Sequence, residues 1–280
     1  MTKLRSVALA LAAGATALTL TACANNSAAP APAGTAGTAG AAAGSEVSLI
    51  TPGKLTVCTH LAFKPFQFKD DSGAIVGYDV DLMDLVAEEL GVEQEIFDIS
   101  FDQITSGSVF AAKRCDAGAA AITITDERAK SATFSQPYFD STLALLVGAD
   151  SGINSAEDLQ GKQVAVQTDT TGQAWADENA GKYGFTSRVF DDMPTASNSV
   201  LGGVTAATVN DNGVLFDFAK DNPTTKVVQE FETGEQYGFN VGNDNKALAE
   251  KIDEVLDAAR ADGRFNDIYK KWFGVDAPTK

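Results

Sequence analysis

Residues 77–91 read Gly77-Tyr-Asp-Val-Asp-Leu-Met-Asp-Leu-Val-Ala-Glu-Glu-Leu-Gly91 and predict an amphipathic helix. Its apolar residues recur at helical spacing and share one face: Leu82, Leu85, Val86 and Leu90. Asp79 is placed to cap the start of the helix, Asp81 suits the positive end of its dipole, and Gly91 can end it. A helix with one apolar face buries that face against a neighbouring layer, so the segments on either side decide the fold class.

Strand and helix patterns alternate around this helix. Residues 54–59 predict a short buried strand before it, and residues 95–98 predict a strand after it. A helix over 101–112 and an apolar strand over 117–124 complete the first set. Such alternation favours parallel βα units, and hence an α/β fold.

A second alternating set follows, with strands expected over 143–148, 163–168 and 205–209 and a helix from about Gly172. The last helix ends at Gly263 and carries an apolar stripe formed by Leu248, Ile252, Val255, Leu256 and Ala259. Two α/β sets of similar size, with no linker between them, predict two lobes and a cleft.

The first 22 residues predict a secretory signal. Lys3 and Arg5 give it a positive start, and residues 7–20 form an apolar run that is too short and too Ala-rich for a membrane span of ~20 strongly apolar residues. Small residues precede Cys23 directly after this run, which resembles a bacterial lipobox. The resemblance implies that Cys23 becomes the N-terminus and carries lipid such as palmitate; a free thiol or a disulfide partner is the alternative.

The composition after residue 22 indicates a linker followed by a folded part. Residues from 24 to about 50 have almost no large apolar side chain, so a flexible linker is expected over 23–50. About 230 residues remain for one large domain or two lobes. The net charge of −17 repels nucleic acid and anionic head groups. These features predict a lipid-anchored protein that faces the extracellular side or periplasm.

Patterns for catalysis are missing from the sequence. It contains one His, no CxxC pair and neither of the Gly-rich phosphate motifs. A His-based metal site, a nucleotide cofactor and a His-dependent triad are therefore not expected. The sequence favours a binding protein over an enzyme.

Five segments, in this order, resemble the polar amino acid family of bacterial extracellular solute-binding proteins, over about Gly53 to Gly274. They are 77–82 with Val86, Ala87 and Leu90, then 122–128, 134–138, 161–168 and 263–274. The resemblance implies a two-lobe periplasmic-binding-protein-like fold (type II), with the ligand in the interlobe cleft and two hinge crossings.

The resemblance also implies how the chain is divided. Lobe 1 is expected over 51–139 and again over 237–280, and lobe 2 over 140–236. The chain is expected to cross near 138–142 and to return near 235–238. Closure of the cleft on a ligand would then be read by the permease of an ABC importer. The protein is expected to act as a monomer.

An amino acid presents an α-carboxylate, an α-ammonium and a side chain. Arg128 offers a fork of donors that fits a carboxylate, and the resemblance implies this contact. A surface Arg paired with Asp126 or Glu127 is the alternative. Thr123 corresponds to the position that completes the carboxylate clamp.

The second lobe is implied to contribute at the same end of the ligand. Thr170 and Thr171 lie between a strand and a helix, where backbone N–H groups bind anions. Asp211 matches the acid that receives the α-ammonium, and a helix cap is its alternative. Phe63 and Phe101 match two aromatic positions that enclose the aliphatic part of the ligand, although Phe is often simple core.

The side-chain end differs from the family pattern. His60 stands where many relatives carry Asp, which lowers the expectation of a basic ligand and favours acidic or amide amino acids. Gln167 and Asn210 lie at other side-chain-facing positions, and Ala121 replaces a common Gly and narrows the pocket. Alternatively, His60 bonds only to protein neighbours.

The two remaining cysteines give opposing indications. An even pair in an oxidising compartment favours a disulfide. However, the expected strand register puts Cys58 and Cys115 roughly four residues out of step, about 13 Å at ~3.3 Å per residue, against a limit of ~7 Å. The geometry slightly favours two buried thiols, and whether Cys58 and Cys115 are bonded stays open.

The combined prediction is a substrate-binding component of an ABC amino acid importer that captures a free polar amino acid. One alternative is an enzyme on the same fold, a dehydratase of the cyclohexadienyl or prephenate type. His60 is its obvious candidate acid and has no evident partner. A ligand-sensing domain is the other alternative.

Overall fold

The computed structural model describes residues 47–278. Its first sheet has the order β4-β1-β5-β12-β6. Strands β1, β4 and β5 run parallel, and β12 pairs antiparallel with β5 and β6. The bounds are β1 Lys54–Thr59, β4 Glu93–Asp98, β5 Ala117–Gly118, β6 Thr133–Phe134 and β12 Asn240–Val241.

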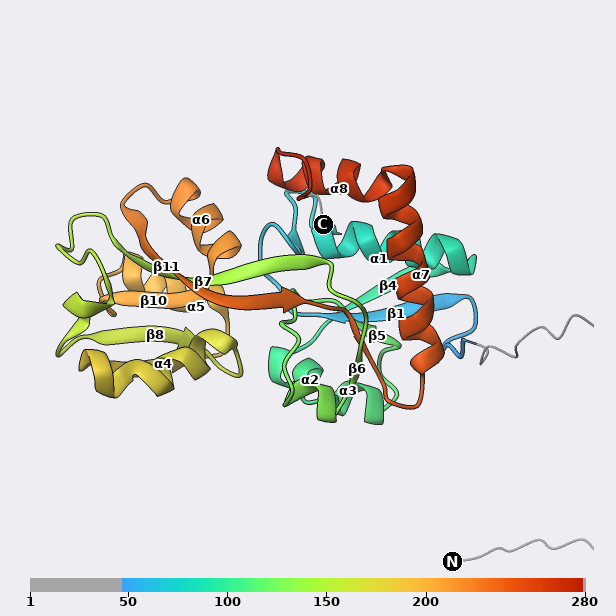
Figure 1. The fold of residues 1–280 in the computed structure, drawn as a ribbon, viewed down its shortest axis with the longest axis horizontal. Coiled ribbons are helices and arrows are strands. Elements are labelled where there is room, and N and C mark those ends of the chain that lie inside the picture. The colour runs from blue at the N-terminus through green and yellow to red at the C-terminus, as the bar shows by residue number, and fades with distance from the viewer. Residues whose placement is uncertain (1–46, 279–280) are drawn as a thin grey trace, which may run out of the picture. The chain divides into compact units, whose positions relative to one another are not determined.

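Helices surround this sheet and form lobe 1 with it (Figure 1). They are α1 Tyr78–Leu90, α2 Phe101–Thr105, α3 Ser108–Ala111, the short 3₁₀ helix η1 Arg128–Lys130, α7 Lys246–Asp262 and α8 Arg264–Phe273. A short hairpin, β2 Phe68–Lys69 with β3 Ile75–Val76, precedes α1.

The second sheet has the order β11-β7-β10-β8-β9 and forms lobe 2 with its helices. Strands β10, β8 and β9 run parallel, whereas β7 and β11 are antiparallel to their neighbours. The bounds are β7 Phe139–Gly148, η2 Ala156–Leu159, β8 Gln163–Gln167, α4 Thr171–Tyr183, β9 Thr186–Phe190, α5 Met193–Leu201, β10 Ala207–Asp211, α6 Asn212–Asp221 and β11 Thr225–Tyr237.

Two neighbouring strands connect the lobes (Figure 1). Strand β7 enters lobe 2 and β11 leaves it, and Phe139 pairs with Tyr237 where the two strands meet lobe 1. The predicted α/β fold with two lobes and two crossings is confirmed. The strands at the crossings are antiparallel, which the alternating pattern did not predict.

Helix α1 matches the stretch that predicted it. Leu82 and Val86 are buried, Gly91 is a left-handed C-cap, and α7 likewise ends at Gly263. The capping role predicted for Asp79 is wrong. The N-cap is Gly77, whose added Cβ would collide with the backbone of Phe66, and Asp79 makes no capping bond.

Two other expectations are wrong. The predicted helix over 101–112 is divided into α2 and α3, because Gly107 between them has a φ of 74°. The predicted strand over 117–124 is continuous only at Ala117 and Gly118, and an isolated bridge joins Thr123 to Tyr237. Between them, Ala121 takes a φ of 49°. That left-handed conformation favours Gly, so Ala121 is under local strain.

The question left open for the two cysteines is answered by a bond, against the slight preference for two buried thiols. Cys58 and Cys115 form a disulfide with their Cα atoms 5.7 Å apart. The register argument did place them out of step, since Cys58 is opposite Gly118. It failed because Cys115 lies in the turn before β5, where the chain is not extended.

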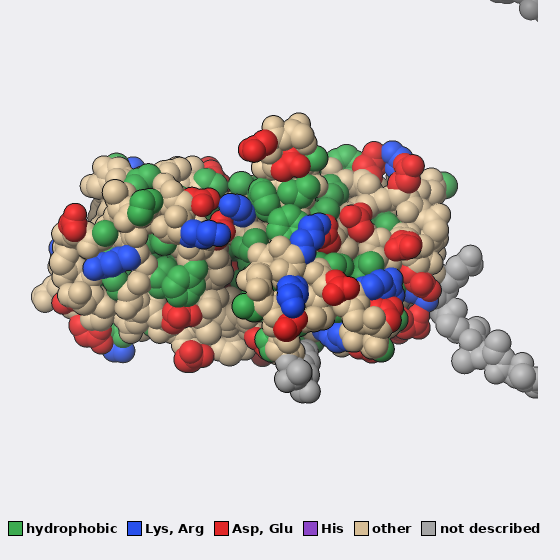
Figure 2. Space-filling view, turned by 90° about the horizontal axis from the view of Figure 1, so that it is seen from above, with side chains coloured by type: hydrophobic (Ala, Val, Ile, Leu, Met, Phe, Trp, Pro, Cys, Tyr) green, Lys and Arg blue, Asp and Glu red, His purple; other side chains and the backbone are tan. Residues whose placement is uncertain are grey.

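Acidic side chains are spread over both lobes in the face shown in Figure 2, in keeping with the net charge of −17. No helix within residues 47–278 is long and apolar enough to cross a bilayer. Cys23, the signal and most of the expected linker lie outside the described residues.

Candidate functional site

A small pocket lies between the two lobes, with a volume of about 20 Å³ accessible to water. All eleven predicted ligand-binding residues line it, together with Gln67 and Ala120. The eleven are His60, Phe63, Phe101, Ala121, Thr123, Arg128, Gln167, Thr170, Thr171, Asn210 and Asp211.

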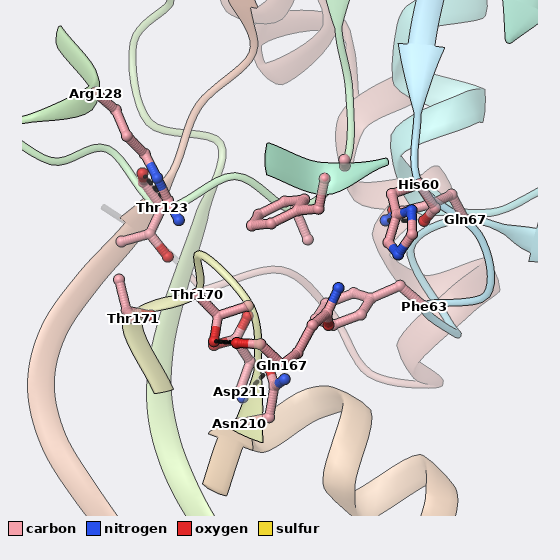
Figure 3. A pocket seen from close by; sticks show the side chains of 13 residues that line it. His60, Phe63, Gln67, Thr123, Arg128, Gln167, Thr170, Thr171, Asn210 and Asp211 are labelled. Carbon is pink, nitrogen blue, oxygen red and sulfur yellow. Dashed lines mark hydrogen bonds between the residues drawn. The ribbon is translucent and has the colours of Figure 1, made fainter. Parts of the chain in front are cut away.

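Strand ends bring these residues together. His60 follows β1, Gln167 ends β8, and Asn210 and Asp211 end β10. In parallel sheets the carboxyl ends of strands meet at one edge, where ligands commonly bind. Figure 3 shows Arg128 and Thr123 at one end of the pocket and His60 and Gln67 at the other.

Arg128 holds its guanidinium between the lobes. Its Nη1 donates to the carbonyl of Thr123 at 2.8 Å, and its Nη2 donates to the carbonyl of Asp169 at 2.7 Å. The predicted alternative, a pair with Asp126 or Glu127, is not formed. Burial lowers the pKa of Arg128, with nearby acids opposing the shift, but a guanidinium stays charged.

The three threonines flank this guanidinium. Thr170 caps α4, because its hydroxyl accepts from the Gln173 N–H at 3.1 Å. Thr171 is the first residue of α4, where N–H groups have no helical acceptor. Thr123 is buried on lobe 1. An anion placed beside Arg128 therefore faces donors from both lobes.

Asp211 provides a buried carboxylate in the same pocket. The hydroxyl of Tyr237 donates to its Oδ2 at 2.5 Å, and its side chain makes no capping bond to α6. Burial raises the pKa of Asp211 to about 7, and the neighbouring Glu235 adds to the increase. A cation placed there would be paired with this carboxylate.

The far end of the pocket contains neutral polar groups. The Nδ1 of His60 lies 3.0 Å from the carbonyl of Ile99, and the Nε2 of Gln67 donates to the carbonyl of His60 at 3.2 Å. Because a carbonyl only accepts, the neutral form of His60 carries its proton on Nδ1, and its Nε2 is then an acceptor. This leaves the Nε2 of His60 and the Oε1 of Gln67 as buried acceptors without a protein partner.

Asn210 and Gln167 differ in whether their side-chain amides are bonded to protein. Asn210 is engaged with protein, since its Nδ2 contacts the sulfur of Met193 and its Oδ1 accepts from the Asp211 N–H. The side-chain amide of Gln167 forms no bond to protein, and its Oε1 is buried without a partner. Gln167 is therefore free to donate or accept.

The apolar walls come from lobe 1. Phe63 and Phe101 are buried, and the Arg128 guanidinium lies 5.4 Å from the ring of Phe101. Behind the pocket, the Oδ2 of Asp79 accepts from the Ala121 N–H at 2.7 Å. Its Oδ1 accepts from the hydroxyl of Tyr138 at 2.8 Å. Asp79 thus supports the strained wall at Ala121.

Contacts between the lobes surround the pocket. The hydroxyl of Thr105 on α2 donates to the carboxylate of Asp169 across the cleft. Lys64 of lobe 1 lies 3.5 Å from Asp217 and 3.2 Å from Asp221 on α6. These bonds need the lobes to be close together, so the structure represents a closed form.

The sequence did not indicate three residues of this region. The resemblance assigned no role to Gln67 or Ala120. Glu235 resembles an ordinary exposed acid on an edge strand, and only the preceding Gly234 marks an irregularity. Within residues 47–278, no group of three or more potential ligands is arranged to hold a metal ion.

The fold and the interlobe pocket define a two-lobe solute-binding protein. The sequence model for bacterial extracellular solute-binding proteins, family 3, matches residues 55–275. The chain therefore belongs to this family, whose name implies an extracellular or periplasmic location.

Several known proteins are similar to this chain. The L-cystine-binding protein TcyJ of Escherichia coli (strain K12) is 30% identical over 227 residues, 80% of this chain and 84% of that protein. An ancestral arginine-binding protein bound to arginine has a TM-score of 0.75 at 39% identity, covering 79% of this chain and 99% of that one. An ancestral arginine-binding protein bound to glutamine also has a TM-score of 0.75, at 37% identity, with coverages of 80% and 100%. These relatives are binding proteins, and the chain is classed with them rather than with enzymes.

Proposed function

We propose that this protein is the substrate-binding component of an ABC amino acid importer. It captures a free polar amino acid in the interlobe pocket and delivers it to a membrane permease. The observation that carries the proposal is that Arg128 and Asp211 line one pocket, from opposite lobes. A cation and an anion so placed complement the two charges common to all amino acids.

The α-carboxylate is bound at the Arg128 end of the pocket. The guanidinium and the first N–H groups of α4 supply charge-assisted bonds, worth on the order of 1.5–3 kcal/mol each. The α-ammonium pairs with ionised Asp211. Because these groups come from both lobes, only the closed form makes all the contacts, and ligand binding favours closure. The hinge movement is located near 138–142 and 235–238.

The side chain of the ligand extends toward His60. Of the acidic and amide classes expected from the sequence, the two fixed acceptors of His60 and Gln67 favour the amide. A carboxylate would face acceptors with its own lone pairs, whereas an amide NH₂ would supply the missing donors. A basic side chain would bury its charge without a carboxylate partner, which is costly. L-Glutamine and L-asparagine are therefore the proposed ligands.

A thermal-shift screen over the twenty amino acids tests the function and the ligand class together. Glutamine or asparagine is expected to raise the Tm most, with a Kd between micromolar and tens of nanomolar, roughly −8 to −10 kcal/mol. No shift with any amino acid would contradict the transport proposal. A larger shift with glutamate or arginine would contradict only the ligand class.

The membrane attachment is a separate proposal. Cys23 carries the lipid, and the chain before residue 51 links it to the lobes. Metabolic labelling with palmitate is expected to mark the wild-type protein and not the Cys23→Ala variant, which would be released from the membrane. Labelling of both proteins would contradict the assignment of Cys23.

A further inference from the structure

Glu235 lies on the strand that connects the lobes, at an irregularity. The pairing of β11 with β7 shifts between Phe231 and Glu235, so that Phe231 is opposite Leu143 and Glu235 is opposite Ser141. Gly234 in this bulge has a φ of 68°. A bulge re-aims the side chain that follows it, and here it directs Glu235 toward the two threonines of the carboxylate-binding end.

One oxygen of Glu235 joins both lobes. Its Oε2 accepts from the hydroxyl of Thr123 on lobe 1 at 3.2 Å. The same Oε2 accepts from the hydroxyl of Thr171, at the start of α4 on lobe 2, at 2.9 Å. Both hydroxyl protons are therefore engaged by Glu235, whereas the N–H of Thr171, the first residue of α4, has no acceptor within the helix.

The charge of Glu235 lies near the guanidinium of Arg128. Asp169, Asp211 and Glu235 all act on this guanidinium, so three carboxylates share one cation. Burial raises the pKa of Glu235, and the bonds from its threonine neighbours oppose the increase. The hydrogen bonds from the threonines therefore favour the ionised form of Glu235 at the hinge.

We infer that Glu235 is a positioning residue that holds the two halves of the carboxylate-binding end together, before any ligand arrives. Whichever lobe Glu235 follows when the hinge opens, it loses the threonine of the other lobe. Its two bonds thus exist together only in the closed form and favour that form. The inference rests on the proposed function only in naming this region the carboxylate-binding end, because the two bonds of Glu235 form in the unliganded protein.

Hydrogen exchange of the unliganded full chain tests this inference without an added amino acid. In Glu235→Ala, amides of residues 168–174 are expected to exchange at least about tenfold faster, because two bonds to a charged acceptor are lost. Amides of α7, whose apolar face is buried in lobe 1, report whether the variant is folded and should not change. Glu232→Ala removes an equal charge from the same strand without touching either threonine, and should leave exchange at 168–174 unchanged.

A conservative variant of Glu235 shows whether its hydrogen bonds or its charge protect residues 168–174. Glu235→Gln keeps an acceptor oxygen for the threonines and is expected to restore most of the protection. Wild-type exchange at 168–174 in Glu235→Ala, or equal acceleration in Glu232→Ala, would overturn the inference. Because no ligand is present, neither result depends on whether an amino acid is the true solute.

Discussion

Tyr237 donates its hydroxyl to the buried carboxylate of Asp211, so a residue of the hinge strand holds the acid proposed to bind the α-ammonium. The same hydroxyl lies 3.0 Å from the hydroxyl of Ser141 on β7. Both crossing strands therefore contact the group that fixes Asp211. The orientation of this carboxylate is coupled to the geometry of the hinge.

Ligand affinity should depend on pH through Asp211. Its pKa of about 7 in the unliganded protein means that binding a cation must release a proton at lower pH. Affinity is expected to rise roughly tenfold per pH unit below this value and to level off above it. Isothermal titration from pH 5 to 8 measures the slope, and Asp211→Asn should bind weakly with a shallower profile, since Glu235, whose pKa burial also raises, remains. A profile as steep as that of the wild type in this variant would contradict the assignment.

The stability of the folded protein depends on pH in the opposite direction to ligand affinity. Because the folded pKa of Asp211 is raised above its usual value, its contribution to the unfolding free energy is fully present below about pH 4. That contribution is lost as pH rises through about 7, and ligand restores stability there. Thermal unfolding of wild type and Asp211→Asn across the same pH range measures the difference.

Arg128→Ala should nearly abolish binding. Loss of two charge-assisted bonds corresponds to at least about 100-fold in Kd. Arg188→Ala is the matched control, because Arg188 is exposed on β9 and contacts the ring of Phe190. Titration showing unchanged affinity in Arg128→Ala would remove the carboxylate role.

Gln167→Glu should change ligand preference. It places a carboxylate at the side-chain end, where the pocket has only neutral acceptors, so a guanidinium would gain a partner. The ratio of arginine to glutamine affinity is expected to rise at least about tenfold. Titration of both ligands against both proteins measures it, and an unchanged ratio would place the ligand side chain elsewhere.

Asp79→Asn should lower the unfolding free energy, although Asp79 lies behind the pocket and is not one of the residues that line it. Asn has one acceptor oxygen for two buried donors, Tyr138 and the Ala121 N–H, at a cost of about 1–3 kcal/mol. Urea unfolding measures the loss, with Glu88→Gln, exposed on the same helix, as the control. Equal stability of the two variants would contradict a supporting role for Asp79.

Removing the disulfide should cost about 4 kcal/mol of unfolding free energy, because the cysteines are 57 residues apart in sequence. Urea unfolding of a Cys58→Ala, Cys115→Ala double variant measures this. A loss below about 1 kcal/mol would show that the surrounding strands hold this loop without the bond.

The site was predictable where it lies in ordered segments at strand ends. Arg128 and Thr123 lie in the 122–128 segment of the resemblance, and Thr170, Thr171 and Asp211 lie just after strands that the pattern predicted, which the fold places at one edge. Cys115 and the residues around Gly107 and Ala121 were mispredicted, since local turns there depart from the regular geometry that a pattern assumes. Glu235 was missed because its role depends on a bulge and on two threonines distant in sequence.

The pairing of Phe139 with Tyr237 has a practical consequence for engineering. The chain enters and leaves lobe 2 at neighbouring points, so lobe 2 is an insertion with adjacent ends. Domain insertions are tolerated when the two ends of the inserted part lie close together. Chimaeras that join lobe 1 of this chain to lobe 2 of another family member would separate the contributions of each half to selectivity.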